Sequence, residues 1–279
     1  MHFYKTYIAL MLFILFSIFG CSIEHSSKHN NTESIIRTEI DFNFGWKFSH
    51  TEDSNAYKTV YDDTDWQSIR LPHDWSIEKE YSQTNTAGAT GYLPGGTGWY
   101  RKNFATPKGD GVTQILFDGI YNHSEVWING QSLGKRPYGY APFHHDLTPY
   151  LKTNGTDNVI AVYVDRTRYV DSRWYTGSGI YRNVKLITTN KTHVPIWGTF
   201  VTTPKIENNS ATVNVTTTLK NQSSTNEVLT QHLRVIDPEG NTVVTKSMPV
   251  NIAANEKIEL ESQLIVKAPK LWDITAPHL

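Results

Sequence analysis

The feature that most constrains the fold is a succession of short β-rich runs, separated by turn residues, from Thr38 to Leu279. Val, Ile, Thr, Tyr and Trp dominate these runs, and such residues favour a pleated, half-buried strand. The clearest runs span residues 113–117, 124–128, 158–164, 184–187, 211–219, 231–236 and 257–266. No stretch of ten or more residues there carries the i, i+3, i+4 periodicity of an amphipathic helix. The sequence therefore predicts an all-β protein.

Turn chemistry supports the strand assignment. Asn129-Gly130 follows the run at 124–128 and precedes a second short run. Because both central positions of a type I′ turn need a positive φ, this pair predicts a two-residue hairpin. Further turns are expected at 221–226 and 237–241, where polar residues interrupt the runs.

The composition excludes one class of partner. Lys and Arg number 26 against 27 Asp and Glu, which gives a net charge of −1 and a sequence pI of about 6.8. A nucleic-acid-binding protein needs a basic surface, so no nucleic-acid partner is expected. Aromatic residues make up 12% and charged residues only 19%, a balance that favours a folded domain over a disordered chain.

Residues 1–21 predict an export signal. The apolar run at 7–19 is shorter than the roughly 20 residues that span a bilayer, and it matches the core of a signal peptide. The sequence Ile18-Phe19-Gly20-Cys21 resembles the bacterial lipobox, which implies a lipoprotein signal peptide and a lipid anchor at Cys21. Ser22 after it favours the outer membrane, with the periplasmic or surface face left open. An ordinary signal peptide with an incidental cysteine is the alternative.

The region after the signal is expected to be a tether. Residues 22–37 are polar and without periodicity, so they predict a flexible linker. Cys21 is the one cysteine of the chain, so no internal disulfide can form.

The remaining chain divides near Asn190. Before it, Trp, Tyr, Gly and Pro are frequent; beyond it, Thr, Val and Asn alternate along longer strands, with Pro195 and Pro204 marking the connection. Residues 38–189 suit a jelly-roll sandwich of about eight strands. Residues 190–279 match the size of an immunoglobulin-like sandwich of about 100 residues. We expect the second domain to end at or just before its last strand.

A series of motifs resembles the N-terminal portion of glycoside hydrolase family 2, which contains β-galactosidases, β-glucuronidases and β-mannosidases. They occur in the family's order and span about 150 residues. They are Phe42-Asn43-Phe44-Gly45-Trp46, Leu71-Pro72-His73-Asp74-Trp75, Gly98-Trp99-Tyr100-Arg101, Phe117-Asp118-Gly119, Val126-Trp127-Ile128-Asn129-Gly130, Gly139-Tyr140, Asp171-Ser172-Arg173-Trp174 and Gly179-Ile180-Tyr181-Arg182. The resemblance implies a galactose-binding-like jelly roll, and the wording of the motifs is closest to the β-galactosidase branch.

The resemblance also implies a sugar contact at Asp171. A loop of the family's jelly roll places an acidic residue near the sugar in the innermost subsite, and that position corresponds to Asp171. A carboxylate makes strong hydrogen bonds to sugar hydroxyls, Trp174 could stack on an apolar sugar face, and Arg173 could orient the carboxylate. A surface ion pair of Asp171 with a neighbouring arginine is the alternative. Gly95 stands where β-galactosidases have a second contact residue, an asparagine, which puts that contact in doubt.

Most other motif residues are expected to be structural. Four tryptophans predict packing between the sheets of a sandwich: Trp46, Trp66, Trp75 and Trp127. His73-Asp74 is interpreted as a hydrogen-bonded loop element rather than an acid/base pair. His144-His145-Asp146 cannot converge on a metal easily, because adjacent strand side chains point to opposite faces. No metal site and no cofactor is predicted.

The sequence is not expected to contain the family's catalytic residues. Retaining hydrolysis of β-glycosides uses two carboxyl groups about 5–5.5 Å apart, and in this family they lie on a (β/α)₈ barrel of about 250 residues. The pairs Asn226-Glu227 and Asn255-Glu256 fall in polar turns and are interpreted as chance matches to the acid/base motif. No catalytic residue is assigned, and the chain alone is expected to be inactive.

The expected function is that of the non-catalytic N-terminal part of a β-galactosidase-like enzyme, which contacts a β-galactoside or related glycan. Two alternatives stay open. The chain could be a free-standing carbohydrate-binding lipoprotein, or an accessory module that pairs with a separate catalytic chain. A homo-oligomer is possible for the full-length enzyme.

Overall fold

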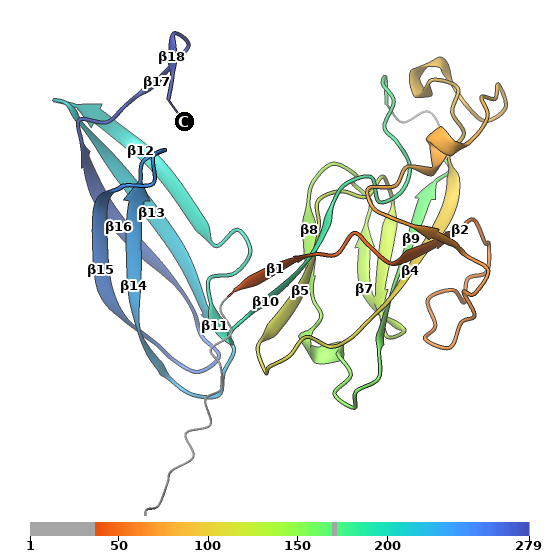
Figure 1. The fold of residues 1–279 in the computed structure, drawn as a ribbon, viewed down its shortest axis with the longest axis horizontal. Helices are drawn as coiled ribbons and strands as arrows, with labels where there is room; N and C mark the ends of the chain where they lie inside the picture. The colour runs from red at the N-terminus through yellow and green to blue at the C-terminus, as the bar shows by residue number, and fades with distance from the viewer. Residues whose placement is uncertain (1–36, 169–171, 279) are drawn as a thin grey trace, which may run out of the picture. The chain divides into compact units, whose positions relative to one another are not determined.

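The structure, a computed structural model, describes residues 37–168 and 172–278 (Figure 1). The predicted signal peptide, the lipid site at Cys21, the tether up to residue 36 and Asp171 lie outside the described residues. The described residues form strands and three short 3₁₀ helices, Trp75–Glu78, Gly88–Thr90 and Thr148–Tyr150. The predicted all-β class is confirmed.

The strands follow the chain in order. They are β1 (Thr38–Asp41), β2 (Trp46–Ser49), β3 (Gln67–Ile69), β4 (Gly96–Phe104), β5 (Val112–Phe117), β6 (Ser124–Ile128), β7 (Gln131–Arg136), β8 (Phe143–Asp146), β9 (Asn158–Arg166), β10 (Val184–Thr189), β11 (Thr192–His193), β12 (Thr199–Glu207), β13 (Ser210–Asn221), β14 (Glu227–Ile236), β15 (Thr242–Ile252), β16 (Lys257–Lys267), β17 (Trp272–Asp273) and β18 (Ala276–Pro277).

The first sandwich consists of two antiparallel sheets. One has four strands in the order β1-β10-β5-β8, and the other has six in the order β3-β2-β4-β9-β6-β7. Non-sequential neighbours such as β4 and β9 are typical of a jelly roll. Its core draws on both sheets: Ile115, Phe117 and Leu186 come from the first, and Tyr100 and Val162 from the second. Burial of this core stabilises the domain without any disulfide.

The tryptophan prediction is right for two residues and wrong for two. Trp46 and Trp75 are fully buried in the core between the sheets. Trp66 and Trp127 are only partly buried, and they pack around Trp99 in a separate cluster. Strand alternation explains the difference for Trp127: its neighbours on β6 point into the core, so its own side chain lies on the outer face of the six-stranded sheet.

The predicted hairpin is confirmed between β6 and β7. Asn129 and Gly130 have φ values of 49° and 83°, and Ile128 pairs with Gln131. The Asn129 side chain also accepts a hydrogen bond of 2.9 Å from the backbone N–H of Val159. The turn residue therefore ties the hairpin to β9 as well as closing it.

The second sandwich, residues 192–278, is built from five long strands. β13 pairs with β12, β16 and the short β11, and β14 pairs with β15. The core contains Leu219, Val250 and Ile252. The turns expected at 221–226 and 237–241 fall between β13 and β14 and between β14 and β15. Pro204 lies inside β12, where the register with β13 shifts, because proline cannot donate to the ladder.

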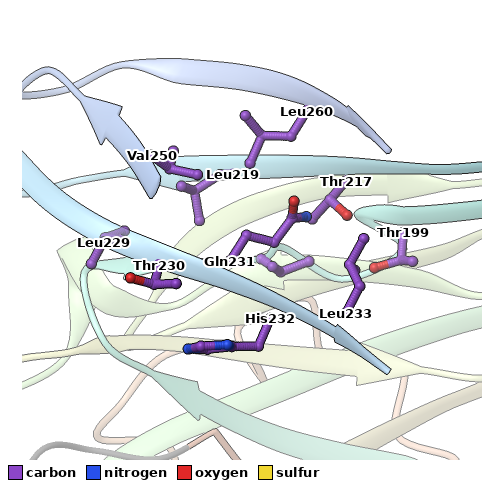
Figure 2. A pocket seen from close by; sticks show the side chains of 11 residues that line it. Thr199, Thr217, Leu219, Leu229, Thr230, Gln231, His232, Leu233, Val250 and Leu260 are labelled. Carbon is purple, nitrogen blue, oxygen red and sulfur yellow. The ribbon is translucent and has the colours of Figure 1, made fainter. Parts of the chain in front are cut away.

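A hollow of about 340 Å³ opens between the sheets of the second sandwich (Figure 2). Apolar side chains such as Leu219 and Val250 line it together with Thr217 and Gln231. The Thr217 hydroxyl and both polar atoms of the Gln231 amide are buried without a hydrogen-bond partner. Among the described residues, β14 forms a ladder with β15 alone. The second sandwich thus has an incompletely filled interior beside a free strand edge.

The last described residues form a small hairpin of their own. β17 and β18 pair with each other through Trp272 and Pro277. Trp272, which resembles the family's final sandwich strand in sequence, is 60% exposed and joins neither sheet of the sandwich.

Candidate functional site

The candidate site centres on the segment 172–183, which follows β9 in the first sandwich. Its first residues are exposed, with Trp174 at 59% and Tyr175 at 41%. The residues 176–180 are buried. The segment therefore combines a presented tip with a base that is packed into the domain.

Asp74 fixes the base of this segment. Its Oδ1 accepts hydrogen bonds from the backbone N–H of Ser76 at 3.0 Å and of Ser178 at 2.9 Å. Its Oδ2 accepts from the Tyr175 hydroxyl. Burial and this bond to Asp74 raise the pKa of Tyr175, so the phenol stays protonated as a donor. A single carboxylate thus caps a 3₁₀ helix and positions the exposed tip.

His73 has the structural role expected for it. Its Nδ1 lies 2.8 Å from the Tyr100 hydroxyl, and its Nε2 lies 3.2 Å from Glu78. Burial lowers the pKa of His73, although the nearby Glu78 carboxylate opposes that shift. Its backbone N–H donates to the carbonyl of Ile180. His73 therefore braces the segment 172–183 and does not face it as an acid or base.

Gly179 lets the segment approach the core. Its φ is +112°, and a Cβ there would overlap the Tyr100 hydroxyl and crowd Trp75. Its N–H and carbonyl pair with the backbone of Tyr121 at 2.8 and 2.9 Å. The Gly-Ile sequence that follows the predicted sugar-contact motif is therefore a packing requirement of this loop.

Exposed aromatic side chains gather beside the tip of the segment. Trp174 donates from Nε1 to the Tyr140 hydroxyl at 2.8 Å. The Tyr140 ring contacts the ring of Tyr138, which is 59% exposed, at a centroid distance of 5.8 Å. We call Tyr138, Tyr140, Trp174 and Tyr175 the aromatic tip. Ring faces and phenol hydroxyls of this kind can stack on a sugar and hydrogen-bond its hydroxyls.

The predicted sugar-contact residues have different outcomes. Asp171 lies outside the described residues, so its geometry is not part of the site described here. Arg173 and Trp174 are both exposed at the tip. The sequence reasoning missed the contribution of Tyr138 and Tyr175. The Gly139-Tyr140 motif was the available signal, but nothing in the sequence showed that it would meet Trp174.

Gly95, the departure from the β-galactosidase pattern, is tightly enclosed. A Cβ at this position would overlap the backbone carbonyl of Arg166. The carbonyl of Gly95 accepts hydrogen bonds from the Trp75 indole at 3.3 Å and from Lys79 Nζ at 3.0 Å. This backbone conformation has no room for an asparagine side chain.

The two Asn-Glu pairs hold turns together. The Glu256 carboxylate accepts from the backbone N–H of Ala253 at 2.7 Å, and Asn226 accepts from Ala254 at 3.0 Å. Glu227 is the first residue of β14 and accepts from the hydroxyl of Thr225. Their interpretation as chance matches to the acid/base motif agrees with these contacts.

Two other kinds of site are absent from residues 37–168 and 172–278. They contain no group of three or more His, Cys, Asp or Glu side chains that could hold a metal ion. They also contain no helix long and apolar enough to cross a membrane.

Comparison with known families places both sandwiches. Residues 41–190 match the family model of the glycosyl hydrolases family 2 sugar binding domain, and residues 192–279 match a second model of glycosyl hydrolases family 2. The fold and these matches define a class of protein with two successive β-sandwiches, of which the first is a sugar binding domain. The chain belongs to glycosyl hydrolase family 2 and corresponds to its N-terminal portion.

The relatives agree with this family. The β-galactosidase BoGH2A of Bacteroides ovatus is 47% identical over 87% of this chain, and a putative β-glucuronidase of Formosa agariphila is 39% identical over 87%. A crystal structure of a family 2 member from Bacteroides cellulosilyticus superposes with a TM-score of 0.80 at 37% identity over 86% of this chain. The matches cover 29%, 23% and 32% of those proteins, so this chain spans about a quarter to a third of their length.

Proposed function

We propose that this chain is the non-catalytic N-terminal part of a β-galactosidase-like glycosidase, in which it supplies one wall of the sugar subsite and a scaffold for a catalytic (β/α)₈ barrel. The observation that carries the proposal is the aromatic tip, which presents Trp174 and Tyr175 on a base fixed by Asp74. A tip that is both exposed and rigidly based suits contact with a ligand held elsewhere.

The proposed residue roles follow from this placement. Asp171 accepts hydrogen bonds from sugar hydroxyls, and Arg173 orients its carboxylate. Trp174 stacks on the apolar face of the ring, because its indole N–H is already satisfied by Tyr140 and its ring faces remain the available recognition surface. The preferred sugar is a β-galactoside or a related glycan.

The proposal for location rests on the sequence. We propose an exported lipoprotein anchored through Cys21, in the outer membrane, with residues 22–37 as tether. We also propose that the functional units divide at residues 189 and 190. The full-length enzyme could then act as a homo-oligomer held near the membrane surface.

A second candidate is a free-standing carbohydrate-binding lipoprotein. The bond from Trp174 to Tyr140 favours it, because both of these side chains belong to the first sandwich. An accessory module that pairs with a separate catalytic chain is the third possibility, and co-purification with a barrel-only protein would support it.

Two measurements on the purified chain test the proposal. The chain alone should not hydrolyse a nitrophenyl β-galactoside, whereas release of nitrophenol in proportion to chain concentration would contradict a non-catalytic role. Lactose should bind with a dissociation constant of about 1 mM or weaker, and its affinity should fall in Asp171→Asn. The exposed Tyr81 lies outside the tip and provides the control Tyr81→Ala, which should leave binding unchanged. Equal binding by wild type and Asp171→Asn would remove the assigned role of Asp171.

A further inference from the structure

A groove on the outer face of the six-stranded sheet has the composition of a second carbohydrate site. It has a volume of about 480 Å³, within the range of about 300–1,000 Å³ typical of small-molecule sites. Its walls come from β4, β6, β9 and the connection between β2 and β3. The lining residues are Glu52, Ser54, Tyr57, Thr97, Trp99, Glu125, Trp127 and Tyr163. We call this the outer groove; none of its residues belongs to the segment 172–183.

The floor of the outer groove is a cross-strand row of side chains. Tyr163 on β9 pairs with Trp99 on one side and with Glu125 on the other. Because side chains alternate along a strand, their neighbours Tyr100 and Val162 point into the core. This row therefore lies on the outer face of the sheet, where Trp99 is buried in a second cluster and Tyr163 is partly exposed.

The aromatic rings of the groove form a cluster of neighbouring, mutually tilted rings. The Trp99 ring lies 5.0 Å from that of Tyr163 and 5.1 Å from that of Trp127. Tyr57 stacks on Trp127 at 5.6 Å with an interplanar angle of 22°. Trp127, Tyr57 and Tyr163 are only partly buried. Partly exposed rings that line a hollow can take the apolar face of a pyranose.

The loop wall of the groove is held in place before any ligand binds. The guanidinium of Arg101, only 2% exposed, donates to the carbonyls of Ala56 and Lys58 on that loop. It also pairs with Asp63 at 2.8 Å, and Asp63 accepts from Lys47 at 2.8 Å. A preformed wall lowers the ordering cost of binding.

The polar groups of the groove are hydrogen-bond acceptors and hydroxyls. Glu52 and Glu125 contribute carboxylates, Ser54 and Thr97 contribute hydroxyls, and the described residues that line the hollow include no Lys or Arg. The Glu125 carboxylate accepts a hydrogen bond from the hydroxyl of Ser132 at 2.8 Å and pairs with the exposed ammonium of Lys135 at 3.5 Å. Lys135 offsets part of the charge of Glu125, but Glu52 adds a second carboxylate to the lining, so the groove fits a neutral sugar better than a uronic acid.

We propose that the outer groove binds a neutral oligosaccharide, through stacking on Trp127, Tyr57 and Tyr163 and through hydroxyl contacts to Glu125. The site is additional to the wall of the sugar subsite proposed above. A second neutral-glycan contact of this kind would hold a polymeric substrate on the jelly roll while one of its residues occupies the subsite.

The test is calorimetric titration of the purified chain with galactotetraose and with digalacturonate. Galactotetraose should bind, and digalacturonate should bind at least about tenfold more weakly. Tyr57→Ala and Glu125→Gln should each lower galactotetraose affinity about five- to tenfold. Glu125→Gln keeps the size of the side chain and an acceptor for Ser132 and gives up only the 3.5 Å pair with the exposed Lys135, so it tests the groove independently if Tyr57→Ala does not fold.

Two controls separate the outer groove from the aromatic tip. Tyr81→Ala should leave affinity unchanged, and Trp174→Ala should leave the groove contribution intact. Loss of galactotetraose binding in Trp174→Ala, with none in Tyr57→Ala and Glu125→Gln, would overturn the outer groove and leave the proposed function standing. Absence of galactotetraose binding at tens of millimolar, or equal affinity for digalacturonate, would also overturn it. Loss only in the groove variants would support the groove and count against the tip.

Discussion

The Asp74 carboxylate accepts a 2.9 Å hydrogen bond from the backbone N–H of Ser178, which lies 104 residues further along the chain. The same carboxylate accepts from Ser76 and from the Tyr175 hydroxyl. One side chain therefore joins the loop before β4 to the loop after β9. The position of the aromatic tip depends on this bond.

Replacing Asp74 tests how much these hydrogen bonds stabilise the domain. Asp74→Ala leaves the N–H groups of Ser76 and Ser178 without their acceptor, and we expect it to lower the free energy of unfolding by about 1.5–3 kcal/mol. Urea unfolding followed by tryptophan fluorescence measures the change, because six of the eight tryptophans lie within residues 41–190. Asp74→Asn keeps one acceptor oxygen and should cost less. A loss below about 0.5 kcal/mol in Asp74→Ala would show that the bonds are dispensable.

The ion pair of Asp63 and Arg101 predicts that the protein loses stability at acid pH. Burial raises the pKa of Asp63, but hydrogen bonds and charge from Lys47 and Arg101 outweigh it, so the pKa is lowered overall. The contribution of Asp63 is therefore complete above the ordinary aspartate pKa of about 3.9, and it is lost as the pH falls through the lower folded value.

Asp63→Asn isolates this contribution. It leaves the buried guanidinium of Arg101 without a counter-charge, so we expect a loss on the order of 3 kcal/mol at pH 7. Denaturant unfolding between pH 2 and pH 7 should show a smaller acid-dependent loss in the variant than in the wild type. Parallel pH profiles for the two proteins would contradict the assignment.

The lowered pKa of Lys102 predicts that stability changes with pH in the alkaline range. Burial lowers its pKa to about 8, against the opposing charge of Asp41, while its Nζ lies 3.4 Å from the centre of the Phe42 ring and donates to the Phe42 carbonyl. The unfolded lysine titrates near 10.4, so the unfolded chain binds more protons between about pH 8 and pH 10.4, and stability rises with pH there. NMR titration of ¹³C-methylated lysines should show a midpoint near 8 that is missing in Lys102→Met. A midpoint near 10 would refute it.

Replacing Trp174 should weaken sugar binding while leaving the stability of the domain nearly unchanged. Its side chain is 59% exposed, so Trp174→Ala should change the free energy of unfolding by no more than about 0.5 kcal/mol. Lactose binding, measured by calorimetry, should weaken at least about threefold because a stacking surface is removed. Trp174→Phe retains a ring and should recover part of the affinity. Unchanged binding in Trp174→Ala would assign the indole a structural role through Tyr140.

Local patterns predicted the strands and the hairpin well, because alternation and positive φ are properties of neighbouring residues. The β6 run at 124–128 and the turn at Asn129-Gly130 agree with the structure residue for residue. The strands β9 and β14 extend beyond their predicted runs, since pairing with neighbours continues the ladder past the most apolar residues.

Non-local relationships were not accessible in the same way. The sequence could not distinguish Trp46, which faces the core, from Trp127, which faces outward beside Trp99, because residue type alone does not fix the buried face. Nor could it show that Trp174 meets Tyr140, 34 positions earlier. The motifs indicated a set of residues, whereas packing decided which of them are exposed at the aromatic tip and which brace its base.

The free edge of β14 has a consequence for the behaviour of the chain in solution. A ten-residue strand that pairs on only one side among the described residues is a template for further strand pairing, and Val228, its second residue, is 79% exposed. β14 contains no proline, and its one register shift against β15 falls at its end, between Val235 and Ile236. We therefore expect edge-to-edge association of chains that grows with protein concentration and is suppressed by Val228→Lys. Sedimentation velocity measures the fraction of associated chains directly.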